Sequence, residues 1–274
     1  MTATTAVTAP TATTQRLGAL YLVPNTLDFG TPGEPPDLRD VLPMGVICHA
    51  ARLGHWVAEN AKSTRAFLKR VDAVVALVQP LQALVIVELP RPRKGMPAAG
   101  RSATPDDARQ LQVLLAPALA GHDIGLISEA GLPAVADPGA ALVQAAHALA
   151  IKVIALPGPS SLLLALAASG LNGQSFAFVG YLPVETQPRG ARIRELEALS
   201  KRLGQTQLMI ETPYRNAALL SALLAHLNPS TRLSVSSGLT LAGGFTHTAS
   251  IAAWRAGPRA LAPDVPAVFA LLAG

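Results

Sequence analysis

Three residues that can do chemistry, Ser128, Glu129 and Asp137, lie where an open α/β sheet binds its ligands. They belong to the stretch Leu126-Ile-Ser-Glu-Ala-Gly-Leu-Pro-Ala-Val-Ala-Asp-Pro-Gly139. An apolar run over 124–127, typical of a buried strand, leads into turns at Gly131 and Pro133, and a helix is expected to begin at Asp137-Pro138. In open α/β sheets, ligands bind in the crevice outside the carboxyl ends of the strands, where such corners lie. The alternative is that Ser128 and Asp137 only cap backbone groups in a tight turn.

A second corner follows about twenty residues later. The predicted strand 153–156 ends in Pro157-Gly-Pro159, and Ser160-Ser161 is expected to open a helix. Two corners rich in small residues predict a cleft in which backbone comes close to a ligand. The corner does not match the G-x-S-x-G nucleophile turn, because Leu162 replaces the second glycine. Phosphate-binding G-x-x-x-x-G-K-[ST] and dinucleotide-binding G-x-G-x-x-G motifs do not occur either.

A third corner is Glu211-Thr-Pro-Tyr-Arg215, which ends a predicted strand and begins a helix at Pro213. Glu211 either caps the turn by accepting helix N–H groups or lines the cleft. In the second interpretation Arg215 is able to hold a carboxylate or a phosphate.

Two basic segments are candidate anion contacts. The loop between Leu89 and Thr104 carries four cations and no carboxylate, and a predicted helix further on begins with two arginines. A solvated surface is the plain interpretation, and phosphate contact is the functional one. If the substrate is RNA, the candidates for contact with its phosphates are Arg91, Arg93, Lys94, Arg101, Arg189 and Arg192.

Composition restricts the class of protein. The chain has 274 residues, of which 50% are hydrophobic and 14% charged, so a sizeable core is expected. The net charge of +5 favours an anionic partner only weakly. One cysteine, Cys48, fits a reducing compartment, and the six histidines lack metal-ligand spacing, so we expect no metal. No apolar run reaches the ~18 residues that span a bilayer, so we expect no membrane association and a cytoplasmic location.

Alternating strands and helices predict an α/β fold with two tandem α/β domains and a cleft between them. We expect a mainly parallel sheet in the first domain and a mixed sheet in the second. The predicted divisions are a disordered tail over 1–16, an N-terminal domain over 17–172 and a C-terminal domain over 173–274.

Four motifs occurring in order resemble the tetrapyrrole methylase superfamily, and most closely its branch of small-subunit rRNA (cytidine-2′-O)-methyltransferases. They are Leu126 to Gly139, Leu156-Pro-Gly-Pro-Ser-Ser161, Phe176-Ala-Phe-Val-Gly-Tyr-Leu-Pro183 and Glu211-Thr-Pro-Tyr-Arg215. The resemblance implies a homodimer that binds S-adenosylmethionine in the interdomain cleft. The cofactor-binding residues that it implies are Pro24, Ser128, Ala130, Gly131, Asp137, Gly139, Pro157, Gly158, Ser160, Glu211, Pro213 and Arg215.

The chain departs from that branch in its other loops. A V-P-T-P-I-G-N-L type first loop is here Val23-Pro-Asn-Thr-Leu-Asp-Phe-Gly30, E-D-T-R is Glu59-Asn-Ala-Lys62, and S-D-A-G is Ser128-Glu-Ala-Gly131. These changes are typical of a divergent paralogue with its own methyl acceptor.

The expected activity is S-adenosylmethionine-dependent methyl transfer to RNA, in the manner of ribose 2′-O-methylation of ribosomal RNA. Glu59, Glu129 and Glu211 are candidate general bases, although catalysis by alignment alone also suffices for an in-line displacement. The alternatives are methylation of a tetrapyrrole or another small molecule, and a non-catalytic binding relative of the same fold.

Overall fold

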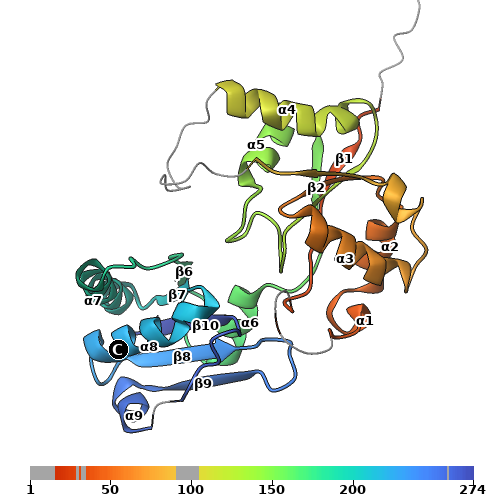
Figure 1. Cartoon of the computed structure of the whole chain (residues 1–274). Coiled ribbons are helices and arrows are strands. Elements are labelled where there is room, and N and C mark those ends of the chain that lie inside the picture. The colour runs from red at the N-terminus through yellow and green to blue at the C-terminus, as the bar shows by residue number, and fades with distance from the viewer. Residues whose placement is uncertain (1–15, 29–30, 32–34, 91–104, 258) are drawn as a thin grey trace, which may run out of the picture.

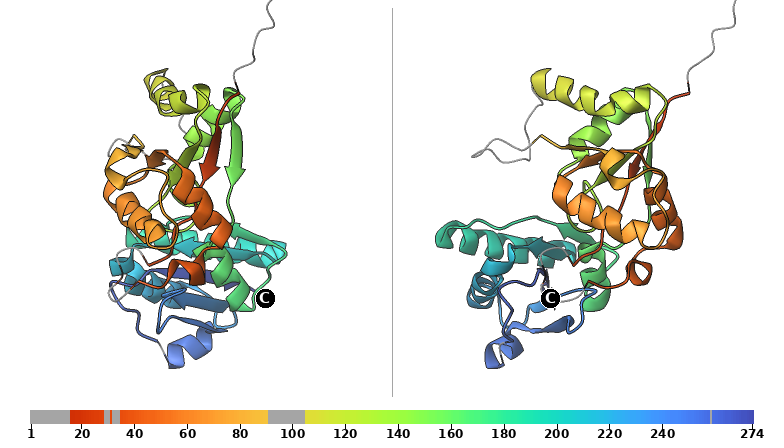
Figure 2. Two further views of the ribbon diagram at one scale, coloured as in Figure 1. Left: turned by 90° about the vertical axis from the view of Figure 1, so that its right-hand side faces the viewer. Right: turned by 45° about the vertical axis from the view of Figure 1, so that its right-hand side comes forward.

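The computed structural model describes residues 16–28, 31, 35–90, 105–257 and 259–274 of the chain. These form two lobes, each built on a five-stranded sheet, and Figures 1 and 2 show one lobe stacked on the other. We call the part from β1 to β5 the first lobe and the part from α6 to β10 the second lobe. The tail predicted to be disordered lies outside the described residues, except for Arg16.

All five strands of the first sheet run parallel, in the spatial order β3-β2-β4-β1-β5. Their bounds are β1 (Ala19–Leu22), β2 (His55–Ala58), β3 (Val85–Glu88), β4 (Ile124–Ile127) and β5 (Lys152–Ala155). The central strand β4 is buried along its whole length, as expected for a strand covered on both faces. Parallel strands bring their carboxyl ends to one edge, and this edge faces the second lobe (Figure 1).

Helices cover both faces of the first sheet. Their bounds are α1 (Leu38–Val41), α2 (Met44–Arg52), α3 (Ala61–Asp72), η1 (Leu81–Ala83), α4 (Pro105–Leu119) and α5 (Ala140–Ala148). Residues of α1, α2 and α3 share one core cluster with Trp56, whereas residues of α4 and α5 share another with Leu126. The first lobe is therefore a three-layer α/β/α unit, which leaves the strand ends as the place for a ligand.

The second sheet is mixed and has the order β6-β7-β10-β8-β9. Only the pair of β6 and β7 is parallel, and the other three pairs are antiparallel. The bounds are β6 (Phe176–Phe178), β7 (Thr206–Ile210), β8 (Arg232–Ser237), β9 (Phe245–Ser250) and β10 (Ala267–Leu272). The predicted α/β class, with a parallel first sheet and a mixed second sheet, is confirmed.

The second sheet has a helix layer on each face. The bounds are α6 (Ser161–Ser169), α7 (Thr186–Leu203), η2 (Pro213–Arg215), α8 (Asn216–His226) and α9 (Ile251–Ala256). Residues of α7, α8 and α9 build one core cluster with Phe269, and α6 packs on the other face through Leu162 and Leu166 against Leu208 and Val268. Helix α6 thus follows the last strand of the first sheet and covers the second. The predicted division between residues 172 and 173 stays a prediction.

Three local predictions from the sequence were wrong. The sequence predicts one short helix near 38–51, but the structure has two helices there, because Pro43 lies between α1 and α2. The sequence also predicts that the glycine-rich stretch after a strand over 233–236 is irregular, but this stretch contains strand β9. Helix α5 begins at Ala140 and not at Asp137-Pro138, because the backbone is still in a turn at these two residues and Gly139 is the N-cap.

Candidate functional site

A pocket of about 510 Å³ lies between the two lobes, at the carboxyl ends of the first sheet. The first lobe contributes the loop after β4 and one residue after β1, and α6 contributes its first turn. The second lobe contributes the ends of β6, β7 and β8 and the start of β10. A volume of this size suits a drug-sized or cofactor-sized ligand. The sequence prediction of an interdomain cleft is therefore matched by a cavity at the predicted corners.

The loop after β4 has an unusual backbone that turns Asp137 into the pocket. Ala134 and Ala136 both have positive φ, at 65° and 63°, a region that costs a non-glycine residue on the order of 1 kcal/mol. The N-cap of α5 is Gly139 at φ 131°, and no side chain caps it. Because the chain is still turning at Asp137, this carboxylate does not cap the helix, and it lines the pocket instead. Asp137 is therefore not the N-cap of α5.

The second corner makes its close backbone approach to the first strand. A Cβ added at Gly158 would lie 2.3 Å from Cβ and 2.4 Å from Cγ of Pro24. Strand β1 lies between β4 and β5 in the sheet, so its end separates the two corners. Pro24 and Gly158 thus pack against each other without lining the pocket, whereas Ser160, the N-cap of α6, and Ser161 line it.

The second lobe supplies an ion pair at the pocket wall. Arg215 donates from Nη2 to Oε2 of Glu211 at 2.6 Å, and Glu211 Oε1 accepts from the backbone N–H of Thr212 at 2.8 Å. Glu211 lines the pocket, whereas Arg215 does not. Glu211 therefore has both of the roles considered from the sequence. It accepts a hydrogen bond from a backbone N–H of the turn, and it lines the pocket.

The pocket is acidic. Glu129, Asp137, Glu211 and Asp264 line it, and no lysine or arginine stands among the described lining residues. Burial, reinforced by the charges of Glu59 and Glu129, raises the pKa of the Asp137 carboxyl to about 7. Burial and the neighbouring Glu59 also raise the pKa of Glu129. Crowded carboxylates with raised pKa values mark a site that favours a cation.

Tyr181 also lines the pocket and was not among the residues singled out from the sequence. Burial raises the pKa of its phenol, and the charges of Asp137 and Glu211 add to the effect. Its position in Phe176 to Pro183, directly after β6, was the available signal. Asp264, before β10, gave no comparable signal, because it lies in no motif.

The predicted site residues divide into two groups. Those that line the pocket are Glu129, Ala130, Gly131, Asp137, Ser160, Glu211 and Pro213. Those that lie behind the lining are Pro24, Glu59, Ser128, Gly139, Pro157, Gly158 and Arg215. Glu59 supports the lining, because its Oε2 accepts from the backbone N–H of Glu129 at 3.1 Å. Ser128 is buried, and its Oγ has no hydrogen-bond partner among the described residues.

The predicted RNA contacts are only partly within the described structure. Arg91, Arg93, Lys94 and Arg101 lie outside the described residues. Arg189 and Arg192 lie in the first half of α7, where Arg192 pairs with Glu195 at 2.8 Å. Along the described segments, no group of three or more histidine, cysteine or acidic side chains is arranged to hold a metal ion. Within those same segments, no helix has the length and apolar character needed to cross a bilayer.

The family model of the tetrapyrrole (corrin/porphyrin) methylases matches residues 62–252, which include β3 to β9 and most of the pocket lining. The chain belongs to this family. The resemblance inferred from the four motifs is confirmed.

Relatives named "Ribosomal RNA small subunit methyltransferase I" match parts of the chain. The protein of Mesorhizobium japonicum is 41% identical over 127 residues, which are 46% of this chain and 42% of the relative. The protein of Vibrio cholerae is 37% identical over 110 residues, covering 40% and 37%, and that of Escherichia coli is 30% identical over 146 residues, covering 53% and 50%. The matches thus span about half the length of these relatives or less.

A solved structure shows a likeness of fold over most of the chain. The native form of uroporphyrin III C-methyltransferase from Thermus thermophilus superposes with a TM-score of 0.52, covering 93% of this chain and 97% of that chain. The sequence identity is 17%, so the likeness concerns the fold alone.

Proposed function

We propose that the protein is an S-adenosylmethionine-dependent methyltransferase acting on RNA, by ribose 2′-O-methylation of small-subunit ribosomal RNA. Family membership and the names of the partial relatives support this activity. We further propose that the chain divides at residues 172 and 173, that it forms a homodimer and that it works in the cytoplasm.

The observation that carries the proposal is the charge of the pocket. S-adenosylmethionine has a sulfonium, an ammonium and one carboxylate, so its net charge is positive. Four acids line the pocket, and Arg215 neutralises one of them, Glu211. The other three, Glu129, Asp137 and Asp264, have no cation beside them among the described lining residues, and this fits that charge. The apolar side chains of Leu132, Val135 and Leu239 also line the pocket, and they suit an adenine ring.

In this proposal Ala130, Gly131 and Asp137 hold the cofactor from the first lobe, and Glu211 and Pro213 hold it from the second. Ser160 holds it from the N-cap of α6. When bound, S-adenosylmethionine supplies an electrophilic methyl group. The task of the protein is to align a hydroxyl of the acceptor with that group and to exclude water. A carboxylate that accepts the hydroxyl proton adds to the rate.

Glu129 suits the role of general base better than the other two candidates. Glu211 is bound by Arg215 and by the N–H of Thr212. Glu59 does not line the pocket, and its Oε2 accepts from the backbone of Glu129. Glu129 lines the pocket, and its raised pKa brings its proton affinity closer to that of a base working near neutral pH.

The same charge argues against a tetrapyrrole acceptor with several carboxylates, because carboxylates lining a pocket repel carboxylates of a ligand. An RNA acceptor is repelled less by these carboxylates, because the nucleoside that enters the pocket carries no charge of its own. Its phosphates would contact cations outside the lining, for which we propose Arg91, Arg93, Lys94, Arg101, Arg189 and Arg192.

A methyl transfer assay tests the proposal. Purified protein is incubated with tritium-labelled S-adenosylmethionine and total RNA from a strain in which the gene is deleted. We expect label in small-subunit rRNA, and none when Gly131→Arg protein is used. Gly131 has φ +67°, and its Cβ would lie 3.3 Å from Leu27 Cδ2, so a large side chain there fills the pocket.

Calorimetry separates the remaining alternatives. Binding of S-adenosylmethionine with label in small molecules instead of RNA would favour the tetrapyrrole or small-molecule reaction. Folded protein that binds no S-adenosylmethionine would contradict both enzymatic proposals and leave the non-catalytic relative.

A further inference from the structure

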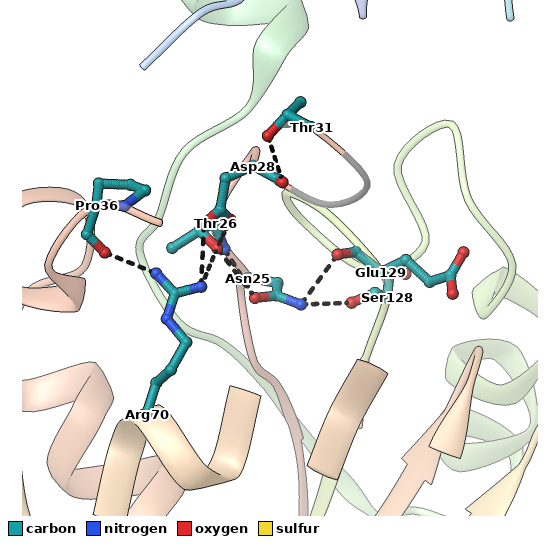
Figure 3. Close-up of polar contacts among 8 residues, drawn as sticks. All are labelled: Asn25, Thr26, Asp28, Thr31, Pro36, Arg70, Ser128 and Glu129. Carbon is teal, nitrogen blue, oxygen red and sulfur yellow. Dashed lines mark hydrogen bonds and ion pairs between the residues drawn. The ribbon is translucent and has the colours of Figure 1, made fainter. Parts of the chain in front are cut away.

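The segment that leaves β1, residues 25–28, contributes one apolar side chain to the pocket lining. Leu27 lines the pocket, and it is the residue of this segment that does so. Residues 25–28 belong to neither a helix nor a strand longer than one bridge, so regular secondary structure does not fix the position of Leu27. What fixes it is a set of side-chain contacts on either side (Figure 3).

The inner contacts come from Asn25, which is buried. Its Nδ2 donates to the carbonyl oxygens of Ser128 at 3.1 Å and Glu129 at 3.0 Å. Its backbone N–H donates to the carbonyl oxygen of Gly131 at 2.9 Å. One residue thus ties the end of β1 to the loop after β4, on which Glu129 and Gly131 line the pocket.

The outer contacts come from Arg70 at the end of α3. Its Nη1 donates to Thr26 Oγ1 at 3.2 Å and to Asp28 Oδ2 at 3.1 Å, and its Nη2 donates to the carbonyl oxygen of Pro36 at 2.7 Å. Thr26 in turn donates to Asp28 Oδ1. The guanidinium, a quarter exposed, therefore holds the residues on both sides of Leu27.

Leu27 faces Gly131 directly. A Cβ added to Gly131 would lie 3.3 Å from Leu27 Cδ2, so the bare Cα of the glycine and the leucine side chain form one surface. A ligand that rests on Gly131 must also touch Leu27. We propose that Leu27 binds an apolar part of the methyl donor, and that Asn25 and Arg70 are positioning residues that hold it beside Gly131. This inference rests on the proposed function, since it needs the donor to lie on Gly131.

Calorimetric titration with S-adenosylmethionine tests the inference. Leu27→Ala removes the apolar contact and should weaken binding about tenfold, as expected for a partly exposed leucine. Leu27→Met keeps the volume and should remain within about twofold of the wild type. Arg70→Gln should weaken binding to a similar extent, and Arg70→Lys, which keeps a cation beside Asp28, should recover part of the loss.

The double variant distinguishes positioning from a general loss of structure. If Arg70 acts through Leu27, then Leu27→Ala with Arg70→Gln should bind no more than about twofold weaker than Leu27→Ala alone. Arg39→Gln is the matched control, because Arg39 pairs with Asp37 on the surface and contacts no residue of 25–28. It should bind as the wild type does.

The outcomes separate this inference from the proposed function. Wild-type binding together with unchanged affinity in Leu27→Ala would overturn the inference and leave the proposed function standing. Independent, multiplying losses in the double variant would overturn the positioning role of Arg70. If the folded wild type binds no S-adenosylmethionine, the proposed function fails, and the inference fails with it. Should Arg70→Gln not fold, the Leu27 variants still decide whether Leu27 contacts the donor.

Discussion

Arg215 neutralises Glu211 across 2.6 Å, although the Glu211 side chain is only 2% exposed and borders the pocket. The pair has two consequences. The guanidinium nitrogen that faces Glu211 is engaged, so an anionic group of a ligand would have to share it. The carboxylate, in turn, depends on this partner for its charge to be tolerated away from water.

Breaking this pair from one side should therefore be costly. Arg215→Met leaves a buried, unpaired carboxylate, and we expect the free energy of unfolding to fall by about 3 kcal/mol. Adding Glu211→Gln removes the stranded charge and should recover most of the loss. Urea denaturation of the two single variants and the double variant measures this. Losses that simply add would show that the two side chains do not interact energetically.

The affinity for a cationic ligand should depend on pH through Asp137. In the free protein burial and the charges of Glu59 and Glu129 raise the pKa of this carboxyl to about 7. A cation in the pocket favours the ionised form, so binding below that pH releases a proton. Affinity should then rise with pH by up to about tenfold per unit and level off above about pH 8. Calorimetry in buffers of different ionisation enthalpy detects the proton, and Asp137→Asn should abolish both effects.

The same carboxyl should make the ligand-free fold less stable as pH rises. Its folded pKa lies above the ordinary value of 3.8, so the folded state binds more protons than the unfolded state between about pH 4 and pH 7. Stability is lost as pH rises through that window. Asp137→Asn should therefore raise the melting temperature at pH 8 and leave it nearly unchanged at pH 4. Asp40→Asn, an exposed acid on α1, is the control for the change in net charge, and an equal gain there would refute the assignment.

Gly158 should tolerate no side chain. The Cβ of Gly158→Ala would meet the rigid ring of Pro24 at 2.3 and 2.4 Å, so the corner and the end of β1 must move apart. We expect a loss of about 1–3 kcal/mol in the free energy of unfolding and weaker ligand binding. Gly45→Ala is the matched control, because Gly45 lies within α2 with no atom within 4 Å of the added Cβ, and it should stabilise by about 0.5–1 kcal/mol. Equal effects at the two glycines would contradict the close packing.

Glu197 on α7 should matter for stability and not for binding. Its buried carboxylate accepts from the backbone and Nδ2 of Asn228, both at 2.7 Å, and from Thr231 Oγ1 at 2.5 Å. Glu197→Ala leaves these donors unpaired and should cost about 2–4 kcal/mol. Glu195→Ala, which removes an exposed partner of Arg192, should cost less than about 1 kcal/mol. Chemical denaturation gives both values, and a loss of ligand affinity in Glu197→Ala would contradict a purely structural role.

Strands could be predicted from the sequence where they are buried, because a buried strand requires apolar residues. The unbroken apolar run near 267–272 predicts a final strand, and β10 has these bounds, because such a run suits a strand covered on both faces. Strand β9 (Phe245–Ser250) could not be predicted in this way, because it is partly exposed and mostly polar. It is held by pairing with β8, where Ser236 Oγ and Thr246 Oγ1 are 2.8 Å apart and Thr248 donates to Ser234 at 2.8 Å. Neither hydrogen bond can be predicted from the sequence, because both depend on the pairing of β9 with β8.

The site shows the same contrast. The corner motifs predicted which loops meet, because their glycines, prolines and acids lie at strand ends. The motifs did not predict that two alanines of positive φ would turn Asp137 inward, since alanine carries no signal for that conformation. They also did not predict the link from Arg70 to Asp28, which joins residues 42 apart that share no periodicity.

The place of β1 in the first sheet also orders events during synthesis. This strand is made first, yet both of its neighbours, β4 and β5, end more than a hundred residues later. At about 5–20 residues per second, the ribosome needs on the order of ten seconds to deliver them. Until then the backbone N–H and C=O groups along both edges of β1 lack their strand partners, and such unpaired edges are prone to aggregation. The first lobe is therefore completed late, at about the time when α6 emerges and the second lobe begins.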